Sequence, residues 1–431
     1  MKCRLVALAM LVSGAPLAAP QEDVEVVAIT GGKIVTLAGE PIENGTILIR
    51  NGKISEVGAE VFVPAGAEII DARGLEVYPG ITDSVSNLGL TEVGSTAATV
   101  DTTELGEYNP QLKAATAVHP ASEHIAVARA NGITHAVSAP GGSGGFGVGG
   151  RYGIHGQASL LNLAGWTVED MAIDTSVGML VNWPKLETSS FDVSTFTRKT
   201  RPFSEVQEEY EKRLRELTDW MEAARRYDHA IEKETDLKLE ALARVTRGEL
   251  PMMILADDER DIRRAVEFAD VHGVRMILLS GRDSWKVKEL LSDKDIPVIL
   301  GPTLALPRTE DEPYDKPLTT ASELHEAGVR VIFASFSSAN SRLLPYEVGN
   351  AVGNGLPWEE GLKGITLYPA ELFGLADELG SIEEGKRANL IVTDGDPLEI
   401  QTQIKHLIID GALTSLDNKH LELYEKYRAR Q

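Results

Sequence analysis

His155, Gln157 and Asp257 are side chains whose types and positions could carry chemistry. His155 and Gln157 come after a strand-like segment at 133–137, and Asp257 directly follows another at 252–255. In a barrel of alternating strands and helices, the residues after strands lie at the catalytic face. His155 could carry a proton or donate to a metal there, although a surface-loop histidine is the commoner case. Asp257 could face the barrel mouth, but helix capping explains it better.

Other patterns with chemical meaning are weaker. The run Gly145 to Gly150 fits G-x-G-x-x-G, but a dinucleotide site also needs a helix opening at the third glycine. A strand-like segment follows instead, so we interpret residues 145–157 as a loop over the barrel mouth. No nucleophile elbow is present, which argues against serine hydrolase chemistry. His135 lies in the middle of a strand-like segment, and we expect it inside the barrel with its hydrogen bonds satisfied.

The elements that would position these residues alternate between apolar strands and amphipathic helices, which predicts a (β/α)8 TIM-like barrel. The most charged section, residues 203–247, has apolar residues at helical spacing and predicts one or two solvated amphipathic helices. A partner-binding surface is the alternative there. Strand candidates are 133–137, 158–163, 252–255, 276–279, 297–300 and 329–334, with helices such as 258–271 and 284–291 between them.

Both ends of the chain are rich in short strands. Asn51-Gly52 joins two of them and favours a type I′ hairpin, because both residues tolerate positive φ. A second group lies at 388–392 and 406–411. Neither group has enough strands to bury a face alone. We therefore predict that 21–78 and 386–431 form one composite β-sandwich, with the barrel of 79–385 inserted between them.

Residues 1–20 combine a basic start, a short apolar run and small residues, as an export signal does. The expected location is therefore periplasmic or extracellular. The single cysteine, Cys3, lies inside this segment, so the exported chain would have no thiol. A net charge of −23 argues against nucleic-acid partners. No later segment has the roughly 20 apolar residues of a spanning helix, which argues against membrane insertion. Assembly as a homo-oligomer is left open.

The segment Pro79 to Asn87 resembles the opening of the catalytic barrel in amidohydrolases, and the resemblance covers nearly the whole chain after the signal. The chain resembles the imidazolonepropionase-like amidohydrolases, and its similar segments are together specific for the superfamily, although each alone is a scaffold motif. Near the C-terminus, Asn389 stands where that family usually has Asp. The similar segments also include Gly31 to Val35, Leu88 to Gly94, Asn131 to Thr134, Leu344 to Glu347, Ile365 to Ala370 and Gly380 to Leu390.

In that family, a His-x-His pair after the opening Asp binds a divalent metal such as zinc. Val85 and Asn87 stand at the two histidine positions, and Leu255 stands at the fifth-strand histidine. The sixth-strand position falls at or near Ser280, and the eighth-strand Asp should lie within 334–338, where no carboxylate occurs. We therefore predict no metal and no other cofactor. The fourth-strand ligand cannot be placed from the sequence. Polar binding candidates are Asn87, Gln157, Ser280 and Ser337.

The resemblance implies a hydrolase that acts on non-peptide carbon–nitrogen bonds of a small or cyclic amide. Because strong ligands are missing from the expected positions, catalytic competence is in question. The alternative is a metal-free exported binding or interaction protein built on a degenerate hydrolase barrel, with a small-molecule ligand in the barrel mouth. A third hypothesis is an enzyme that uses His155 or Asp257 without metal.

Overall fold

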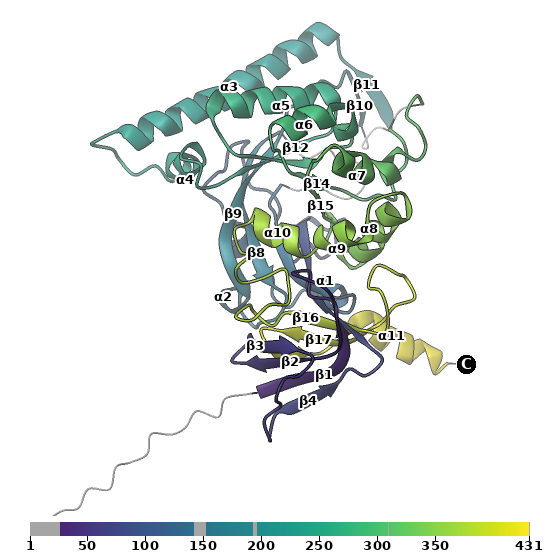
Figure 1. The fold of residues 1–431 in the computed structure, drawn as a ribbon. Helices are drawn as coiled ribbons and strands as arrows, with labels where there is room; N and C mark the ends of the chain where they lie inside the picture. Colours follow the sequence, from purple (N-terminus) through teal and green to yellow (C-terminus); the bar gives the residue numbers. More distant parts are fainter. Residues whose placement is uncertain (1–25, 142–151, 193–195, 309, 431) are drawn as a thin grey trace, which may run out of the picture.

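The computed structural model describes residues 26–430 except 142–151, 193–195 and 309. The predicted export signal and the glycine-rich run lie outside the described residues. Two sheets organise the rest: a barrel sheet, and a second sheet at the opposite end of the molecule from the long helix α3 (Figure 1). Within the described residues, no helix combines the length and apolar character needed to cross a membrane.

The barrel sheet has eight strands in the order β15-β14-β13-β12-β9-β8-β7-β6. Their bounds are β6 Ile81–Ser86, β7 Ile133–Ser138, β8 Gly153–Asn162, β9 Ala172–Asn182, β12 Met252–Ala256, β13 Met276–Ser280, β14 Val298–Leu300 and β15 Val331–Phe333. The predicted barrel is confirmed, with one departure. Strand β8 runs antiparallel to both of its neighbours. The connection from β8 to β9 holds only the one-turn helix α2 (Val168–Met171), which is too short for a parallel crossover.

Helices cover the outside of the barrel. The charged section predicted to be helical forms α3 and α4, and α3 buries Val206, Tyr210, Leu217, Met221 and Ala224 on one face. The longer helices are α1 Glu123–Arg129, α3 Phe203–His229, α4 Leu237–Thr246, α5 Glu259–His272, α6 Lys288–Asp293, α7 Lys316–Glu326, α8 Leu344–Gly353, α9 Trp358–Lys363, α10 Leu367–Leu372 and α11 Lys419–Arg428. Short 3-10 turns are η1 Ala97–Thr99, η2 Ala114–Ala117, η3 Ser284–Val287 and η4 Ser341–Leu343, and a small hairpin pairs β10 Ser189–Asp192 with β11 Thr197–Thr200.

Strands from both ends of the chain share the second sheet, in the order β18-β17-β16-β5-β1-β2-β3 with β4 on β1. Their bounds are β1 Val26–Ile34, β2 Ile42–Arg50, β3 Lys53–Gly58, β4 Glu68–Asp71, β5 Glu76–Pro79, β16 Leu390–Thr393, β17 Ile404–Ile409 and β18 Ala412–Thr414. Asn51 and Gly52 have φ values of 51° and 77°, as the predicted type I′ turn requires. The two chain ends join where β16 pairs with β5.

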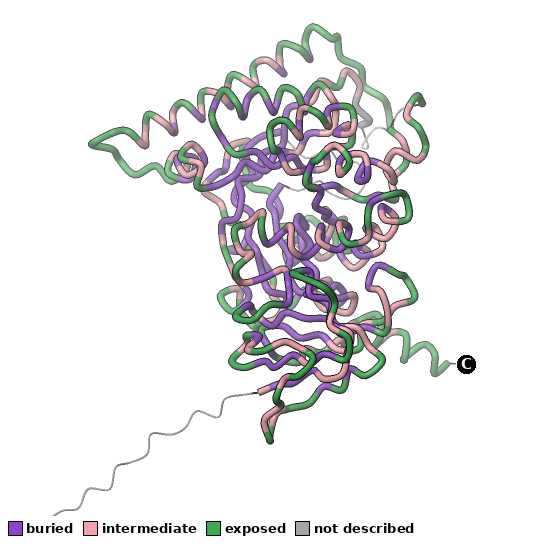
Figure 2. Tube along the Cα trace, viewed as in Figure 1, coloured by how far each residue is buried: buried purple, intermediate pink, exposed green. Residues whose placement is uncertain are grey.

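Burial follows the two sheets. Figure 2 shows buried backbone along the barrel strands and in the second sheet, while much of α3 and α11 is exposed. One apolar cluster packs the barrel against its outer helices, and a second runs through the barrel from β6 to α10. A third cluster holds the second sheet together and includes residues from both chain ends. The barrel is thus a packed core, and its chemistry must lie at its ends.

Candidate functional site at the barrel mouth

The centre of the barrel mouth is apolar. Val85, at the first metal-ligand position, is 2% exposed and belongs to the cluster that fills the barrel. Leu255 and Phe336 pack against the same cluster. Phe336 lies in the segment after β15 where the family's carboxylate was expected. Three side chains without strong lone-pair donors therefore pack together where ligands would have to converge.

Asn87, at the second ligand position, has a structural hydrogen bond. Its Oδ1 accepts from the backbone N–H of Ser338 at 2.6 Å. The backbone N–H of Phe336 donates to the carbonyl of Val85 at 2.9 Å. Ser335 donates to Asp83 in turn, through its backbone N–H at 2.9 Å and its hydroxyl at 2.5 Å. Asp83 and Val85 lie in β6, and Asn87 directly follows its last residue. Together they fasten β6 to the segment after β15, where the barrel closes without a regular strand ladder.

Asp83 is the one ionisable group in this closure. The residue is fully buried, and burial raises the pKa of its carboxyl to about 6 despite the hydrogen bonds from Ser335. Near neutral pH the ionised carboxylate needs those donors, so the serine and the aspartate act as a unit.

The sixth- and eighth-strand positions share an unusual backbone conformation. Ser280 has φ of 65° and Phe336 has φ of 51°, both in the left-handed region. For a bulky residue such as Phe this conformation is strained and often marks a functional or tightly packed site. The hydroxyl of Ser337 accepts a local hydrogen bond from the backbone N–H of Asn340 at 3.3 Å.

The fourth-strand position is occupied by Asn182, which sequence reasoning missed. It is the last residue of β9 and lies opposite Leu255 of β12 in the strand register. Asn182 is buried, and its Nδ2 donates to the carbonyl of Gly141 at 3.0 Å. A polar residue that ends a long buried strand was the available signal.

His155 and Gln157 lie in strand β8, so their assignment to a loop was wrong. Both are buried. The ring of His155 packs against Gly141, whose φ of 67° and lack of a side chain make room for it. Gln157 donates to the carbonyl of Pro110 at 2.9 Å and accepts from Ser176 at 2.5 Å. Arg244 of α4 also donates to Gln157, which therefore serves the contact between sheet and helix.

Asp257 does not cap α5, which corrects the capping interpretation. The N-cap position belongs to Asp258, and its side chain makes no capping hydrogen bond. Asp258 instead pairs with Arg308 at 2.7 Å. The Oδ1 atom of Asp257 is buried and has no hydrogen-bond donor among the described residues. Asp261 lies in the first turn as expected, but it is buried and accepts from Tyr210 at 3.3 Å.

His135 is a buried strand residue, as predicted, and it joins the barrel to the second sheet. Its Nδ1 pairs with the hydroxyl of Thr134 at 2.8 Å, and its Nε2 accepts from the amide of Asn389. Asn389 also donates to Asn162 at 3.1 Å. Burial, with a smaller effect of Arg387, lowers the pKa of His135 to about 3, so the ring is neutral at ordinary pH. This histidine has a structural role.

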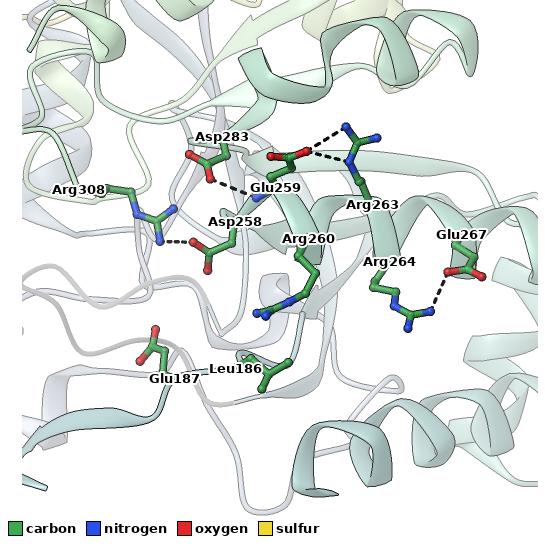
Figure 3. Close-up of a pocket in the computed structure, with 10 residues that line it drawn as sticks. All are labelled: Leu186, Glu187, Asp258, Glu259, Arg260, Arg263, Arg264, Glu267, Asp283 and Arg308. Atoms are coloured by element: carbon green, nitrogen blue, oxygen red, sulfur yellow. Dashed lines mark hydrogen bonds and ion pairs between the residues drawn. The ribbon is translucent and has the colours of Figure 1, made fainter. Parts of the chain in front are cut away.

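A charged cavity of about 810 Å³ lies beside the mouth (Figure 3). The segments that line it follow β9, β12, β13 and β14, so it opens on the C-terminal face of the barrel. Glu187 comes from the first of these segments, and Asp283 and Arg308 come from the last two. One side of α5, from Asp258 to Glu267, forms the long wall. Barrel proteins place their ligands at this face.

The residues at the ligand-like positions do not fit a divalent metal. Within the described parts of the chain, no three histidine, cysteine or carboxylate side chains are grouped in a way that could hold one. Val85 and Leu255 offer no donor atom, and the amide oxygen of Asn87 already accepts a hydrogen bond. No reaction step through a metal can be derived from this arrangement.

Comparisons with known proteins agree with the fold. The model of the amidohydrolase family matches residues 237–416. The crystal structure of an amidohydrolase from Thermotoga maritima superposes with a TM-score of 0.71 at 26% identity, covering 90% of this chain and 99% of that one. The chain is thus similar to the amidohydrolase superfamily, in sequence over residues 237–416 and in fold along nearly its whole length.

Two relatives match in sequence over only part of their own length. Amidohydrolase tasK of Hapsidospora irregularis is 23% identical over 406 residues, which cover 85% of this chain and 39% of the relative. N-substituted formamide deformylase of Arthrobacter pascens is 32% identical over 149 residues, 28% of this chain and 27% of the relative. The chain thus spans well under half the length of these two proteins.

Proposed function

We propose that this amidohydrolase-superfamily protein is an exported binding protein whose barrel does not support metal-hydroxide hydrolysis. The observation that carries the proposal is the packing of Val85, Leu255 and Phe336 against one apolar cluster at the mouth. A bound metal makes a nucleophile at neutral pH only when several imidazole or carboxylate donors hold it. The export component rests on the signal-like residues 1–20.

The hydrogen bonds at the mouth support the same proposal. Asp83, Val85 and Asn87 form a regular closure with the segment after β15. A metal at Asn87 would compete with the backbone N–H of Ser338 for the same amide oxygen. The charged cavity next to the mouth supplies a binding site on the face where barrel proteins bind ligands.

A second candidate is the family reaction, hydrolysis of a non-peptide carbon–nitrogen bond in a small or cyclic amide. The whole-length likeness to the Thermotoga maritima amidohydrolase favours it. This candidate needs a proton carrier that does not rely on a metal, and His155 and Asp257 are the side chains available for that role. His155 is buried at the mouth end of β8, and Asp257 follows β12.

Metal content and amide hydrolysis, measured on one preparation, test the proposal. Protein purified without chelator should contain well under one equivalent of zinc, manganese or nickel. Chelator should leave the melting temperature unchanged, because a metal bound only to the folded state would raise it. A panel of cyclic and N-substituted amides should not be hydrolysed above the buffer rate. A stoichiometric metal whose removal abolishes amide hydrolysis would overturn the proposal.

A further inference from the structure

The cavity beside the mouth presents acceptors at one corner and donors along one wall. At the corner, Asp258 and Asp283 lie near Arg308 (Figure 3), and the carboxylate of Asp257 also acts electrostatically on that guanidinium. Burial opposes the charge on Arg308, but the carboxylates of Asp258, Asp257 and Asp283 outweigh it and raise the pKa of the guanidinium. Lys286 pairs with Asp283 at 3.1 Å. The corner therefore has three carboxylates against two cations.

Asp257, which immediately precedes Asp258 of the corner, has an acceptor atom without a donor within the described part of the chain. The buried Oδ1 of Asp257 lacks a donor in the described structure, and a buried carboxylate oxygen without a donor is energetically unfavourable. The carbonyl of Asp257 accepts from the N–H of Asp283, which ties the two segments of the corner together. A positively charged N–H group entering this corner would meet several carboxylates at once.

The wall formed by α5 is rich in donors. Arg260, Arg263 and Arg264 lie at spacings of three and four residues, on the side of α5 that lines the cavity. Arg263 pairs with Glu259 at 3.0 Å and Arg264 with Glu267 at 3.0 Å, both at the surface, whereas Arg260 pairs with the buried Asp261 at 3.5 Å. A guanidinium has five N–H donors, so most of these remain for a ligand. Exposed ion pairs of this kind contribute only about 0–1 kcal/mol, so a ligand can replace them.

We propose that this cavity binds a small zwitterionic molecule, with its ammonium group at the Asp258–Asp283 corner and its carboxylate on the arginines of α5. The helix rises about 9 Å from Asp258 to Arg264, which sets the scale of the separation between the two charged groups. Glu187, on the opposite wall, provides a further carboxylate for the ammonium group. This inference gives the proposed binding function a ligand class and a site. It rests on the proposed function in one respect, that the ligand is bound and not hydrolysed.

Probes that carry one or both charges on the same carbon chain test the inference. Isothermal titration calorimetry would compare 6-aminohexanoate with hexanoate and hexylamine, and with the shorter 4-aminobutanoate. Each charge contributes charge-assisted hydrogen bonds, so 6-aminohexanoate should bind at least about tenfold more tightly than either singly charged probe. It should also bind more tightly than 4-aminobutanoate, which is too short to reach both ends. Equal binding of a singly charged probe, or no binding of 6-aminohexanoate, would overturn the inference.

Variants assign the binding to this cavity. Asp258→Asn keeps an N-cap residue type while removing the charge, and Arg260→Gln with Arg264→Gln removes the donors. Each should weaken binding of 6-aminohexanoate by about tenfold with an unchanged melting temperature. The control is Arg226→Gln, which removes a comparable exposed pair with Glu222 on α3. Unchanged binding in both cavity variants, or equal loss in the control, would defeat the assignment. Metal analysis of the same preparation reports separately on the proposed function.

Discussion

Ser335 donates two hydrogen bonds to the buried carboxylate of Asp83, from its backbone N–H at 2.9 Å and from its hydroxyl at 2.5 Å. The two residues come from opposite ends of the barrel sequence and meet where its first and last strands face each other. Asp83 lies two residues before Val85, so an acidic residue next to the ligand-like positions fastens the barrel.

Asp83→Asn should remove a pH dependence of stability. The folded pKa is about 6 and the reference value is 3.8, so the folded state binds the proton more tightly. Protonation of Asp83 therefore makes its full favourable contribution to the free energy of unfolding below about pH 4, and this contribution is lost as the pH rises through 6. Relative to the variant, the wild type should lose about 3 kcal/mol of unfolding free energy across that window. Urea unfolding of both proteins between pH 4 and 7 measures the difference. Parallel pH profiles would contradict it.

Val85→His with Asn87→His should create a weak zinc site. Val85 lies near the end of β6 and Asn87 directly follows its last residue, so imidazoles at the two positions would lie close together at this end of the strand. Each buried imidazole displaces apolar packing or a hydrogen bond, so the variant should melt below the wild type without metal. Zinc should then raise the melting temperature of the variant and leave the wild type unchanged.

The control for the zinc experiment is Val85→Ala with Asn87→Ala, which opens the same space without adding ligands. A zinc response in this control would point to binding elsewhere. Absence of any response in the histidine variant would mean that residues 85 and 87 do not face a site where a metal can sit.

Asn389→Asp should destabilise the contact between barrel and second sheet. Asn389 donates to His135 and Asn162, and an ionised Asp donates to neither. The expected loss is on the order of 1–3 kcal/mol at pH 8. A carboxylate beside His135 would raise the pKa of that ring, so the loss should shrink as pH falls toward 5. Chemical unfolding at both pH values measures it, with the exposed Asn354→Asp as the matched control. Equal effects of the two changes would refute the assigned role.

Gly411→Ala should destabilise the protein through the meeting of two turns. Gly411 has φ of 80°, and an added Cβ would lie 2.6 Å from the Cα of Gly52. Both the backbone conformation and the close approach disfavour Ala, so we expect a loss of about 1–3 kcal/mol. Gly94→Ala is the control, because its Cβ would meet no atom within 4 Å and its φ is not positive. Thermal melting that ranks the two variants equally would contradict the prediction.

Periodicity and turn chemistry predicted much of the fold. The Asn51-Gly52 turn, the apolar runs that became β12 and β13, and the helical spacing under the charges of α3 each have local physical causes. The antiparallel direction of β8 could not be read in this way, because strand direction depends on which neighbours pair. The pairing of β8 with β9 in turn depends on the connection between them, which is too short for the crossover that parallel strands need.

The candidate site was only partly predictable. The sequence places Val85, Asn87 and Leu255 at ligand-like positions, but it does not reveal that Ser338 occupies the Asn87 amide or that Phe336 fills the mouth. The arginines of α5 were missed because the helical pattern of 258–271 already had a structural explanation, and Asn182 was missed because no strand was predicted at 172–182. Asn182 ends one strand and these arginines follow another, so their common position at the C-terminal face of the barrel is visible only in the folded structure.

The pairing of β16 with β5 also constrains how the chain can be made. About 300 residues of barrel separate the two strands, so β5 leaves the ribosome long before its partner exists. At roughly 5–20 residues per second, its open edge waits on the order of tens of seconds. An unpaired edge is a template for wrong pairing with other chains. Synthesis of this protein should therefore depend on a factor that shields the first strands until the last ones arrive.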